Sequence, residues 1–369
     1  MVSFVDIVFC GDLVLDEPRP EHWLSGIKPA LRGVDLVVGH LEVPHTRRGT
    51  ELKGDVPAPA ADPEHLAALR EAGFHVLTLA GNHMADCGAE GIADTKQELE
   101  RLGIACCGAG ADLNEARLPA ILQIMGKRIA ILSYNCVGPE NGWATDTEAG
   151  VAFVRVETAN GGPIAPSAQL DRAAPESVRA MQRDIVSAKQ NADLLMVALH
   201  KGIVHTPARL APYERPVAHA AIDAGADIVL GHHAHIIRGI EFYRGKPIFH
   251  GLGNGCVVTR ALSPDQDHPA RADWARKRKE LFAFEPDPDY RLAPFHPQAV
   301  NSILGCVRWH DDGRMEAGFI PVHVEAPGRP VIADGTKARE IIDYVAQITV
   351  AAGLPILSLK VEDYMVVAS

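Results

Sequence analysis

The sequence predicts an α/β protein organised around a parallel sheet. Residues 194–199 and 227–231 are continuous apolar runs, the pattern of strands that are covered on both faces. Between them, residues 211–224 carry apolar side chains at helical spacing and stop at Gly225. Histidines follow each of the two strands in this strand–helix–strand unit. Ligands of α/β proteins gather at the carboxyl ends of such strands.

The composition favours a cytoplasmic globular protein over a nucleic-acid-binding or membrane protein. The chain has 369 residues and 47% hydrophobic residues, enough for one large α/β domain over residues 1–369, although two domains fit the length equally well. Its net charge of −11 argues against nucleic-acid binding. No apolar run reaches the roughly 18–20 residues of a membrane span, and the N-terminus has no signal-peptide pattern. Seven irregularly spaced cysteines fit the cytoplasmic location that we expect, and oligomerisation stays open.

Polar residues follow the first two predicted strands. Residues 6–10 form the first strand, and Asp12 comes directly after it. Residues 34–38 form the second, followed by His40 and Glu42, whose side chains point to the same side of an extended chain. A purely structural role explains them as well: Asp12 could be a turn residue, and His40 and Glu42 could form a salt bridge at the edge of the sheet. Both carboxylates and the imidazole nevertheless fall where a ligand site is expected.

The third predicted strand, residues 74–80, runs into Asn82 and His83. A helix follows, for which Asp86 is well placed as the N-cap. Side-chain packing does not readily explain two adjacent polar groups after a buried strand, because burying them costs free energy. An amide oxygen and an imidazole side by side supply a metal ligand and a proton donor.

The remaining residues continue the alternation of strands and helices, with two long irregular segments. Residues 134–175 are expected to form a long loop over or near the site, carrying a strand at 150–156, and residues 259–300 form a variable insert. Residues 301–369 are expected to complete the fold. The other predicted elements are helices at 63–72, 176–190 and 336–352, hairpins at 118–133 and 302–324, and strands at 103–107, 356–359 and 364–367.

The insert allows two interpretations. It contains the basic run 271–279 followed by aromatic residues among prolines. A solvated helix with a surface loop explains this composition. A lid whose cations, Arg271 among them, select an anionic substrate explains it as well.

The polar residues at the strand ends together indicate a metal site. Mixed carboxylate and imidazole ligands suit Mn, Fe or Zn, and their number is sufficient for two ions that share a bridging carboxylate. Two ions about 3.5–4 Å apart activate a water for hydrolysis, and a histidine outside the ligand set can act as general acid. The residues are Asp12, His40, Glu42, Asn82, His83, His200, His233 and His235.

The order of these motifs resembles a known family. Gly81-Asn82-His83-x-x-Asp86-x-Gly88 and Gly231-His232-His233-Ala234-His235 carry most of the resemblance. Gly11-Asp12, Leu41-Glu42, His200-x-Gly202 and Leu252-Gly253-Asn254 extend it. Together they resemble the bacterial capsule-synthesis (poly-γ-glutamate synthesis, CapA/PgsA-type) proteins of the calcineurin-like metallophosphatase superfamily. The resemblance implies a four-layer α/β/β/α sandwich, here with a lid-like insert, and two divalent ions, Mn, Zn or Fe.

The resemblance also assigns roles to residues by matching motif. It implies that one ion is held by Asp12, Glu42 and His235. It implies that the other is held by Asn82, His200 and His233, with Glu42 as the bridge. His83 matches the histidine that protonates a leaving group, and Asp86 would orient it or cap the helix.

Several positions depart from the family pattern. His40 stands where the family usually has Asn, so it is a candidate for an additional ligand or a substrate contact. Lys201 replaces the Trp of the usual His-Trp-Gly. We expect His205, His250 and Arg271 to contact the substrate.

We therefore expect a dinuclear metal-dependent hydrolase that acts on a small anionic molecule with an amide, lactone or phosphoester bond. One alternative is a phosphomonoesterase or phosphodiesterase. Another is a non-catalytic component of capsule or poly-γ-glutamate synthesis. His83 distinguishes catalysis from binding, because a pure binding protein needs no proton donor beside its metal ligands.

Overall fold

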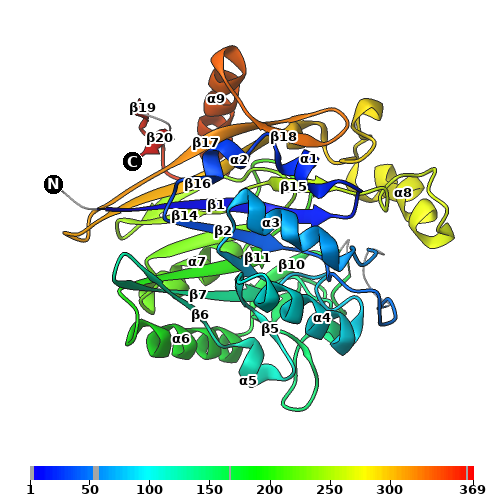
Figure 1. Ribbon diagram of the computed structural model, residues 1–369, viewed down its shortest axis with the longest axis horizontal. Coiled ribbons are helices and arrows are strands. Elements are labelled where there is room, and N and C mark those ends of the chain that lie inside the picture. The colour runs from blue at the N-terminus through cyan, green and yellow to red at the C-terminus, as the bar shows by residue number, and fades with distance from the viewer. Residues whose placement is uncertain (1–3, 53–57, 166–167, 363–364) are drawn as a thin grey trace.

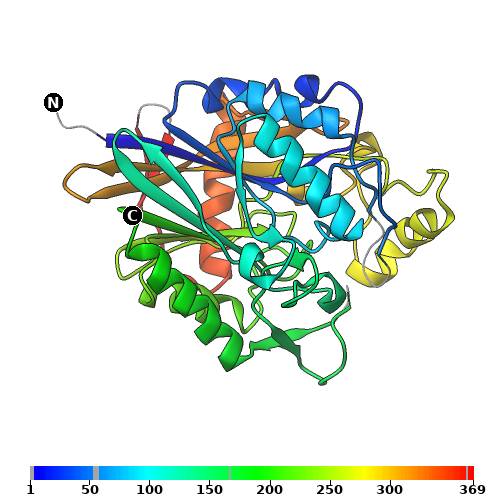
Figure 2. The same cartoon turned by 60° about the horizontal axis from the view of Figure 1, so that its bottom comes forward.

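Two β-sheets lie face to face at the centre of the protein, and helices cover the outer face of each sheet (Figures 1 and 2). The computed structural model describes residues 4–52, 58–165, 168–362 and 365–369. The arrangement confirms the predicted α/β/β/α sandwich.

The first sheet contains the N-terminal strands and the C-terminal hairpins. β1 pairs in parallel with β2 on one side, and on the other side it pairs antiparallel with β16 and, further along, in parallel with β15. In spatial order the strands are β19 (Leu359–Glu362), β20 (Met365–Ala368), β17 (Met315–Glu325), β16 (Asn301–His310), β1 (Phe4–Leu15), β2 (Leu36–Leu41), β3 (Val76–Thr78) and β4 (Ala105–Cys107), with β15 (Asn254–Val258) beside β1 and β18 (Arg329–Ile332) beside β17.

The second sheet contains the predicted strand–helix–strand unit. β11 pairs in parallel with both β7 and β12, and α7 (Glu214–Asp223) connects β11 to β12. The strand order is β13 (Ile240–Tyr243), β14 (Lys246–Phe249), β12 (Ile228–His233), β11 (Leu194–Lys201), β7 (Lys127–Asn135) and β6 (Ala120–Ile124). Two small sheets involve the segment 134–175: β9 (Val156–Thr158) pairs with β10 (Leu170–Ala173), and β8 (Gly150–Val151) pairs with β5 (Ala109–Gly110).

The helices form the outer layers. α3 and α4 lie over the first sheet, and α6 lies over the second, on the opposite side of the molecule (Figure 2). α9 packs against β17 and β13, so it contacts both sheets. The helices are α1 (Pro20–Leu24), α2 (Lys28–Leu31), α3 (Leu66–Ala72), α4 (Gly88–Arg101), α5 (Leu113–Ala116), α6 (Pro175–Lys189), α7, α8 (Pro269–Phe282) and α9 (Gly335–Ala351), with short 3-10 turns at Pro63–His65, Glu140–Gly142, Pro288–Tyr290 and Pro297–Val300.

Three hydrophobic clusters separate the four layers, and β1 shows how. Because successive strand side chains point to opposite faces, Val8 packs toward the helices while Ile7 and Phe9 pack between the sheets. Met196 and Phe249 meet them from the second sheet. Burial of this kind stabilises a protein by about 25 cal/mol per Å² of apolar surface. None of the helices in the described ranges is long and apolar enough to cross a membrane.

Candidate metal centre

The predicted site residues meet at the edge where the parallel strands of both sheets end. β1, β2 and β3 bring them from the first sheet, and β11 and β12 from the second. Gly11 permits this convergence, because a Cβ at that position would lie 2.0 Å from the carbonyl oxygen of Gly253. The amide of Asp12 instead donates to that oxygen at 3.2 Å. This close approach places the Asp12 side chain next to the chain that leads into β15.

The first group of donor atoms is formed by Asp12, Glu42 and His235. Nε2 of His235 lies 3.2 Å from Oε1 of Glu42, and Nδ1 lies 3.7 Å from Oδ2 of Asp12. The backbone amide of His233 donates to both Asp12 oxygens, at 3.3 and 3.1 Å. Nδ1 of His235 contacts Oδ1 of Asn254 at 2.9 Å, which fixes the ring.

The second group is formed by Asn82, His200 and His233. Nε2 of His200 lies 2.7 Å from Oδ1 of Asn82 and 3.1 Å from Nδ1 of His233. His40 lies behind this group, with its ring 4.6 Å from that of His200 and its Nδ1 3.0 Å from Oγ1 of Thr78. β2 extends to Leu41, so His40 lies inside the strand and not after it.

The backbone at the end of β12 is held in a strained conformation. His233 and His235 have φ values of 84° and 52°, in the left-handed region that costs a non-glycine residue about 1–2 kcal/mol. Strain of this kind persists where the surrounding structure holds it, and it clusters at functional sites. Here it turns two neighbouring imidazoles toward the carboxylates of the first sheet.

The donor atoms are compatible with divalent metal ions. Three sets have one donor atom each within 4.8 Å of the others: Asp12 with Glu42 and His235; Glu42 with His200 and His233; and Asp12 with His40 and His200. Within the described ranges, both oxygens of Glu42, Nε2 of His40 and Nδ1 of His200 are buried without a hydrogen bond of ordinary geometry. Buried polar atoms in native proteins nearly always have a hydrogen-bond partner or a ligand, so these atoms are candidates to bind a ligand.

Charge and burial set the protonation of the site. Burial raises the pKa of Asp12 well above its usual value, and the nearby Glu42 carboxylate raises it further. Burial would also raise the pKa of Glu42, but His235 outweighs it and brings that pKa to about 2. Burial would lower the pKa of His235, which Glu42 instead raises to about 9. Burial lowers the pKa of His233 to about 3, so its neutral ring is ready to bind a metal.

His83 stands beside the donor groups as a candidate proton donor. Its Nδ1 lies 2.8 Å from Oδ2 of Asp86, and both side chains are largely buried. α4 begins at Gly88, with Cys87 at the N-cap position, so Asp86 does not cap the helix. Of the two roles considered for Asp86, its position supports the orientation of His83.

The sequence as a whole was also compared with known proteins. Residues 6–257 match the family described as "Bacterial capsule synthesis protein PGA_cap". The chain belongs to this family.

Two relatives carry the name CapA. This PGA_cap protein is 28% identical to the "PGA biosynthesis protein CapA" of Bacillus subtilis over 92% of its own length and 76% of the relative's. It is 29% identical to the "Capsule biosynthesis protein CapA" of Bacillus anthracis over 62% of its own length and 52% of the relative's. Among solved structures, the calcineurin-like phosphoesterase YfkN from Bacillus subtilis matches over 95% of this chain and 99% of that one, with 10% identity and a TM-score of 0.37.

A cleft of about 740 Å³ opens in front of the candidate metal centre of this PGA_cap protein. Asn82, His83, His233 and His235 form its floor. The segment 134–175 lines one side, and the insert 259–300 lines another. The two irregular segments of the sequence therefore both border the cleft.

His205, one of the three residues expected to contact substrate, lines this cleft. It has a φ of 53°, and its amide donates to the carbonyl of Ala234 at 2.9 Å. Its ring lies 5.8 Å from that of His235. Burial lowers the pKa of His205 well below the usual value, so the ring is neutral.

His250 does not line the cleft, contrary to the expectation that it contacts substrate. It is fully buried between Lys201 and Glu241, at 3.2 Å from Nζ of Lys201 and 2.9 Å from Oε2 of Glu241. Lys201 in turn forms a fully buried ion pair with Glu214, at 2.8 Å. The lysine that replaces tryptophan therefore belongs to a buried charge network below the loop 202–212. His250 orients that network.

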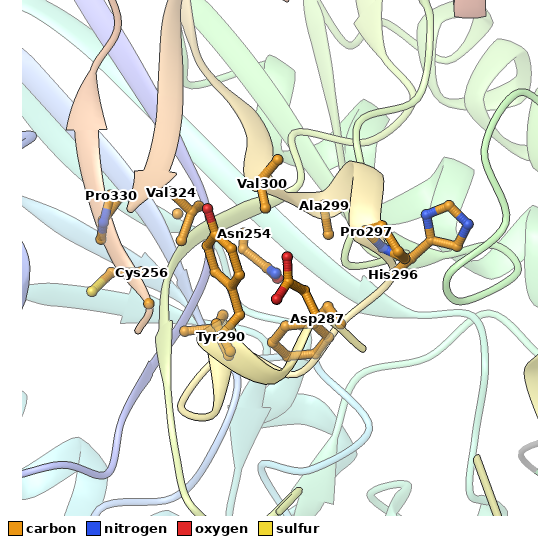
Figure 3. Close-up of a pocket in the computed structure, with 15 residues that line it drawn as sticks. Asn254, Cys256, Asp287, Tyr290, His296, Pro297, Ala299, Val300, Val324 and Pro330 are labelled. Atoms are coloured by element: carbon orange, nitrogen blue, oxygen red, sulfur yellow. The ribbon is translucent and has the colours of Figure 1, made fainter. Parts of the chain in front are cut away.

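Arg271 is also not among the residues that line the cleft. Its guanidinium pairs with Glu51 at 2.7 Å, which attaches α8 to the N-terminal half of the chain. A second anchor lies further along the insert, where Phe295 and Ala299 pack with Val257 of β15. Figure 3 shows the side chains around a small cavity there, Asn254 and Tyr290 among them. The volume of this cavity is about 20 Å³. Such a volume holds about one water molecule.

Asn254 was not singled out as a site residue from the sequence. Its side chain holds His235, and it begins β15. The signal was present, because Leu252-Gly253-Asn254 is part of the motif set, but nothing in the sequence shows that β15 lies beside β1.

Proposed function

We propose that this PGA_cap protein is a hydrolase that depends on two divalent metal ions. The observation that carries the proposal is the placement of His83, held by Asp86, on the floor of the cleft beside the donor groups that contain Glu42. A protein that only binds a ligand has no need for an oriented imidazole at that position. Mn, Zn and Fe all suit the nitrogen and oxygen donors.

The ions, when bound, supply a water-derived nucleophile at neutral pH and neutralise developing negative charge. The residues of the chain position and transfer the proton. Asp86 holds Nδ1 of His83, so Nε2 is the atom through which His83 gives a proton to the leaving group. The hydroxyl of water joins the electrophilic atom, the leaving group departs with the bonding electron pair, and the second proton of water restores His83.

The cleft supports a small-molecule substrate. Its volume of about 740 Å³ lies in the range of pockets for small molecules. Arg209 at the lining offers one permanent positive charge, which fits a substrate with one anionic group. The bond cleaved would be an amide, a lactone or a phosphoester, since water attack and protonation of the leaving group serve all three.

Metal content and turnover test the proposal together. Protein purified without chelators is expected to contain about two equivalents of metal per chain, measured by elemental mass spectrometry. A panel of amides, lactones and phosphomono- and phosphodiesters then identifies the bond cleaved. His83→Asn is expected to keep the metal and to lose activity by about 10²–10⁴-fold, the contribution typical of a general acid. His22→Asn, an exposed position on α1, is the matched control.

A second candidate is a non-catalytic role in capsule or poly-γ-glutamate synthesis. The names of the two CapA relatives favour it. It predicts metal binding without turnover of any compound in the panel, and no effect of His83→Asn on polymer synthesis. Full metal content with an inert protein would therefore support this candidate and refute the hydrolase.

A further inference from the structure

The insert presents an aromatic wall to the cleft. Phe282 and Phe295 line the cleft and lie 5.1 and 5.7 Å from the ring of His205. Phe284 is not among the lining residues, but it also lies 5.1 Å from that ring. Phe295 also stacks on His235 at 4.7 Å, so the wall reaches the metal centre itself. Aromatic rings at these separations form a surface that suits another flat ring.

The cations of α8 do not face the cleft. Arg271 pairs with Glu51, and Lys277 pairs with Asp273 at 2.7 Å. Arg278 is buried, donates to the carbonyls of Pro294 and Leu262, and lies over the ring of Trp274. The basic run of the sequence is thus used to hold the insert together, and the residues that α8 turns to the cleft are Trp274, Leu281 and Phe282.

The other walls of the cleft are also mainly apolar. Among the described residues that line it, Arg209 is the one with a permanent charge. Polar groups come from the floor and from Thr206 and Gln169. The apolar residues of these walls are Val137, Pro139, Ile164, Leu170, Ile203, Val204 and Leu210.

We propose that the substrate carries an apolar planar group, such as a phenyl ring, beside the bond that is cleaved, and that this group packs in the cleft against Trp274, Leu281 and Phe282 of the insert. This inference rests on the proposed hydrolase function and names its substrate class. The walls of the cleft do not favour a polyanionic chain as the substrate, because away from the metal-binding floor the described lining offers one permanent positive charge, Arg209. His205 supports this wall through its ring contacts with Phe282 and Phe295, and its buried Nδ1 has no hydrogen-bond partner among the described residues.

Two phosphonates of equal charge test the proposal by calorimetry on the metal-loaded protein. Phenylphosphonate and methylphosphonate present the same group to the metals and differ in the ring alone. We expect phenylphosphonate to bind at least tenfold more tightly. A γ-linked glutamate hexamer is expected to bind more weakly than either.

Variants of the wall locate the effect. Phe282→Ala is expected to reduce the preference for phenyl to below threefold, whereas Phe282→Leu, which keeps an apolar side chain, retains most of it. Leu281→Asn changes a residue on the same wall that is 41% exposed, so folding is not at risk, and it is expected to reduce the preference as well. Leu118→Ala changes an exposed leucine outside the cleft lining and is expected to have no effect.

The outcomes separate this inference from the proposed function. Equal affinity for the two phosphonates, no binding of either, or tighter binding of the glutamate hexamer would overturn the inference. Turnover of a substrate without an apolar group, combined with equal phosphonate affinities, would leave the hydrolase standing and remove the aromatic subsite. A phenyl preference that follows the variants in a protein without turnover would establish the subsite and remove the hydrolase.

Discussion

Oε1 of Glu42 lies 3.2 Å from Nε2 of His235, and the same carboxylate belongs to a second donor group with His200 and His233. Glu42 therefore lies between the imidazoles of two separate groups. Glu42 directly follows β2 of the first sheet, whereas all three histidines come from strands of the second sheet or from the loop after β12. A carboxylate in this position is suited to bridge two ions, as the resemblance implied.

The bridge predicts unequal losses of metal. Glu42→Gln removes a ligand common to both ions, so metal content is expected to fall well below one equivalent per chain. His233→Ala removes a ligand from one group alone, and about one equivalent should remain. Elemental mass spectrometry after dialysis measures both, with His22→Asn as the control. Equal metal contents in the two variants would contradict a bridging Glu42.

The position of Asp86 predicts that replacing it lowers catalysis without weakening the binding of metal or substrate. Asp86→Asn leaves the donor groups intact but weakens the hold on Nδ1 of His83. Loss of such an orienting partner typically costs about 10–100-fold. We expect kcat to fall by that factor, while KM changes less than threefold and metal content stays at the wild-type value. A loss of metal in this variant would show that Asp86 supports the metal centre itself.

The sequence identified the strand-end residues because each follows an apolar run, and the parallel order of the strands brings their ends together. Asp12, Glu42, His200, His233 and His235 illustrate this, since local pattern and sheet topology are sufficient to place them near one another. The contacts of residues outside this set, such as Arg271 and His250, could not be predicted in the same way.

Arg271 and His250 show the reason. Arg271 pairs with Glu51, 220 positions away in the sequence, and no local sequence pattern identifies that partner. His250 meets Lys201 because β12 and β14 are neighbours in the second sheet and β11 lies next to β12. A basic run also looks the same in sequence whether its cations face a ligand or, as in α8, face carboxylates and carbonyls of the protein.

The Lys201–Glu214 pair predicts a large stability effect away from the metal centre. Both side chains are completely buried, and removal of one partner leaves an uncompensated charge, which typically costs about 3–5 kcal/mol. Lys201→Met should lower the free energy of unfolding by that amount in urea denaturation. Adding Glu214→Gln to Lys201→Met should recover part of the loss.

A surface pair is the matched control for this measurement. Lys277 and Asp273 have the same kind of contact at 2.7 Å, but both side chains are more than half exposed. Lys277→Met is expected to change the free energy of unfolding by less than about 1 kcal/mol. Similar losses in Lys201→Met and Lys277→Met would show that Lys201 is not held as a buried charge.

His250 predicts how stability depends on pH. Burial and the ammonium of Lys201 together lower its pKa to about 4, although Glu241 opposes the shift. The neutral ring accepts a hydrogen bond from Lys201 at Nδ1 and donates one to Glu241 from Nε2. Between pH 6.5 and 4 the imidazole of His250 binds a proton in the unfolded chain but stays neutral in the folded protein. The stability that comes from the neutral ring is therefore fully present above pH 6.5 and is lost as the pH falls toward 4.

The expected slope is about 1.4 kcal/mol of unfolding free energy per pH unit for one such group. His250→Gln keeps one donor and one acceptor but cannot titrate. Urea denaturation of wild type and variant at pH 7, 6 and 5 should therefore give a shallower decline for His250→Gln, by about that slope, because the other buried histidines contribute equally to both proteins. Parallel declines would mean that His250 takes up its proton in the folded protein too, and the hydrogen bond from Lys201 would have to be reassigned.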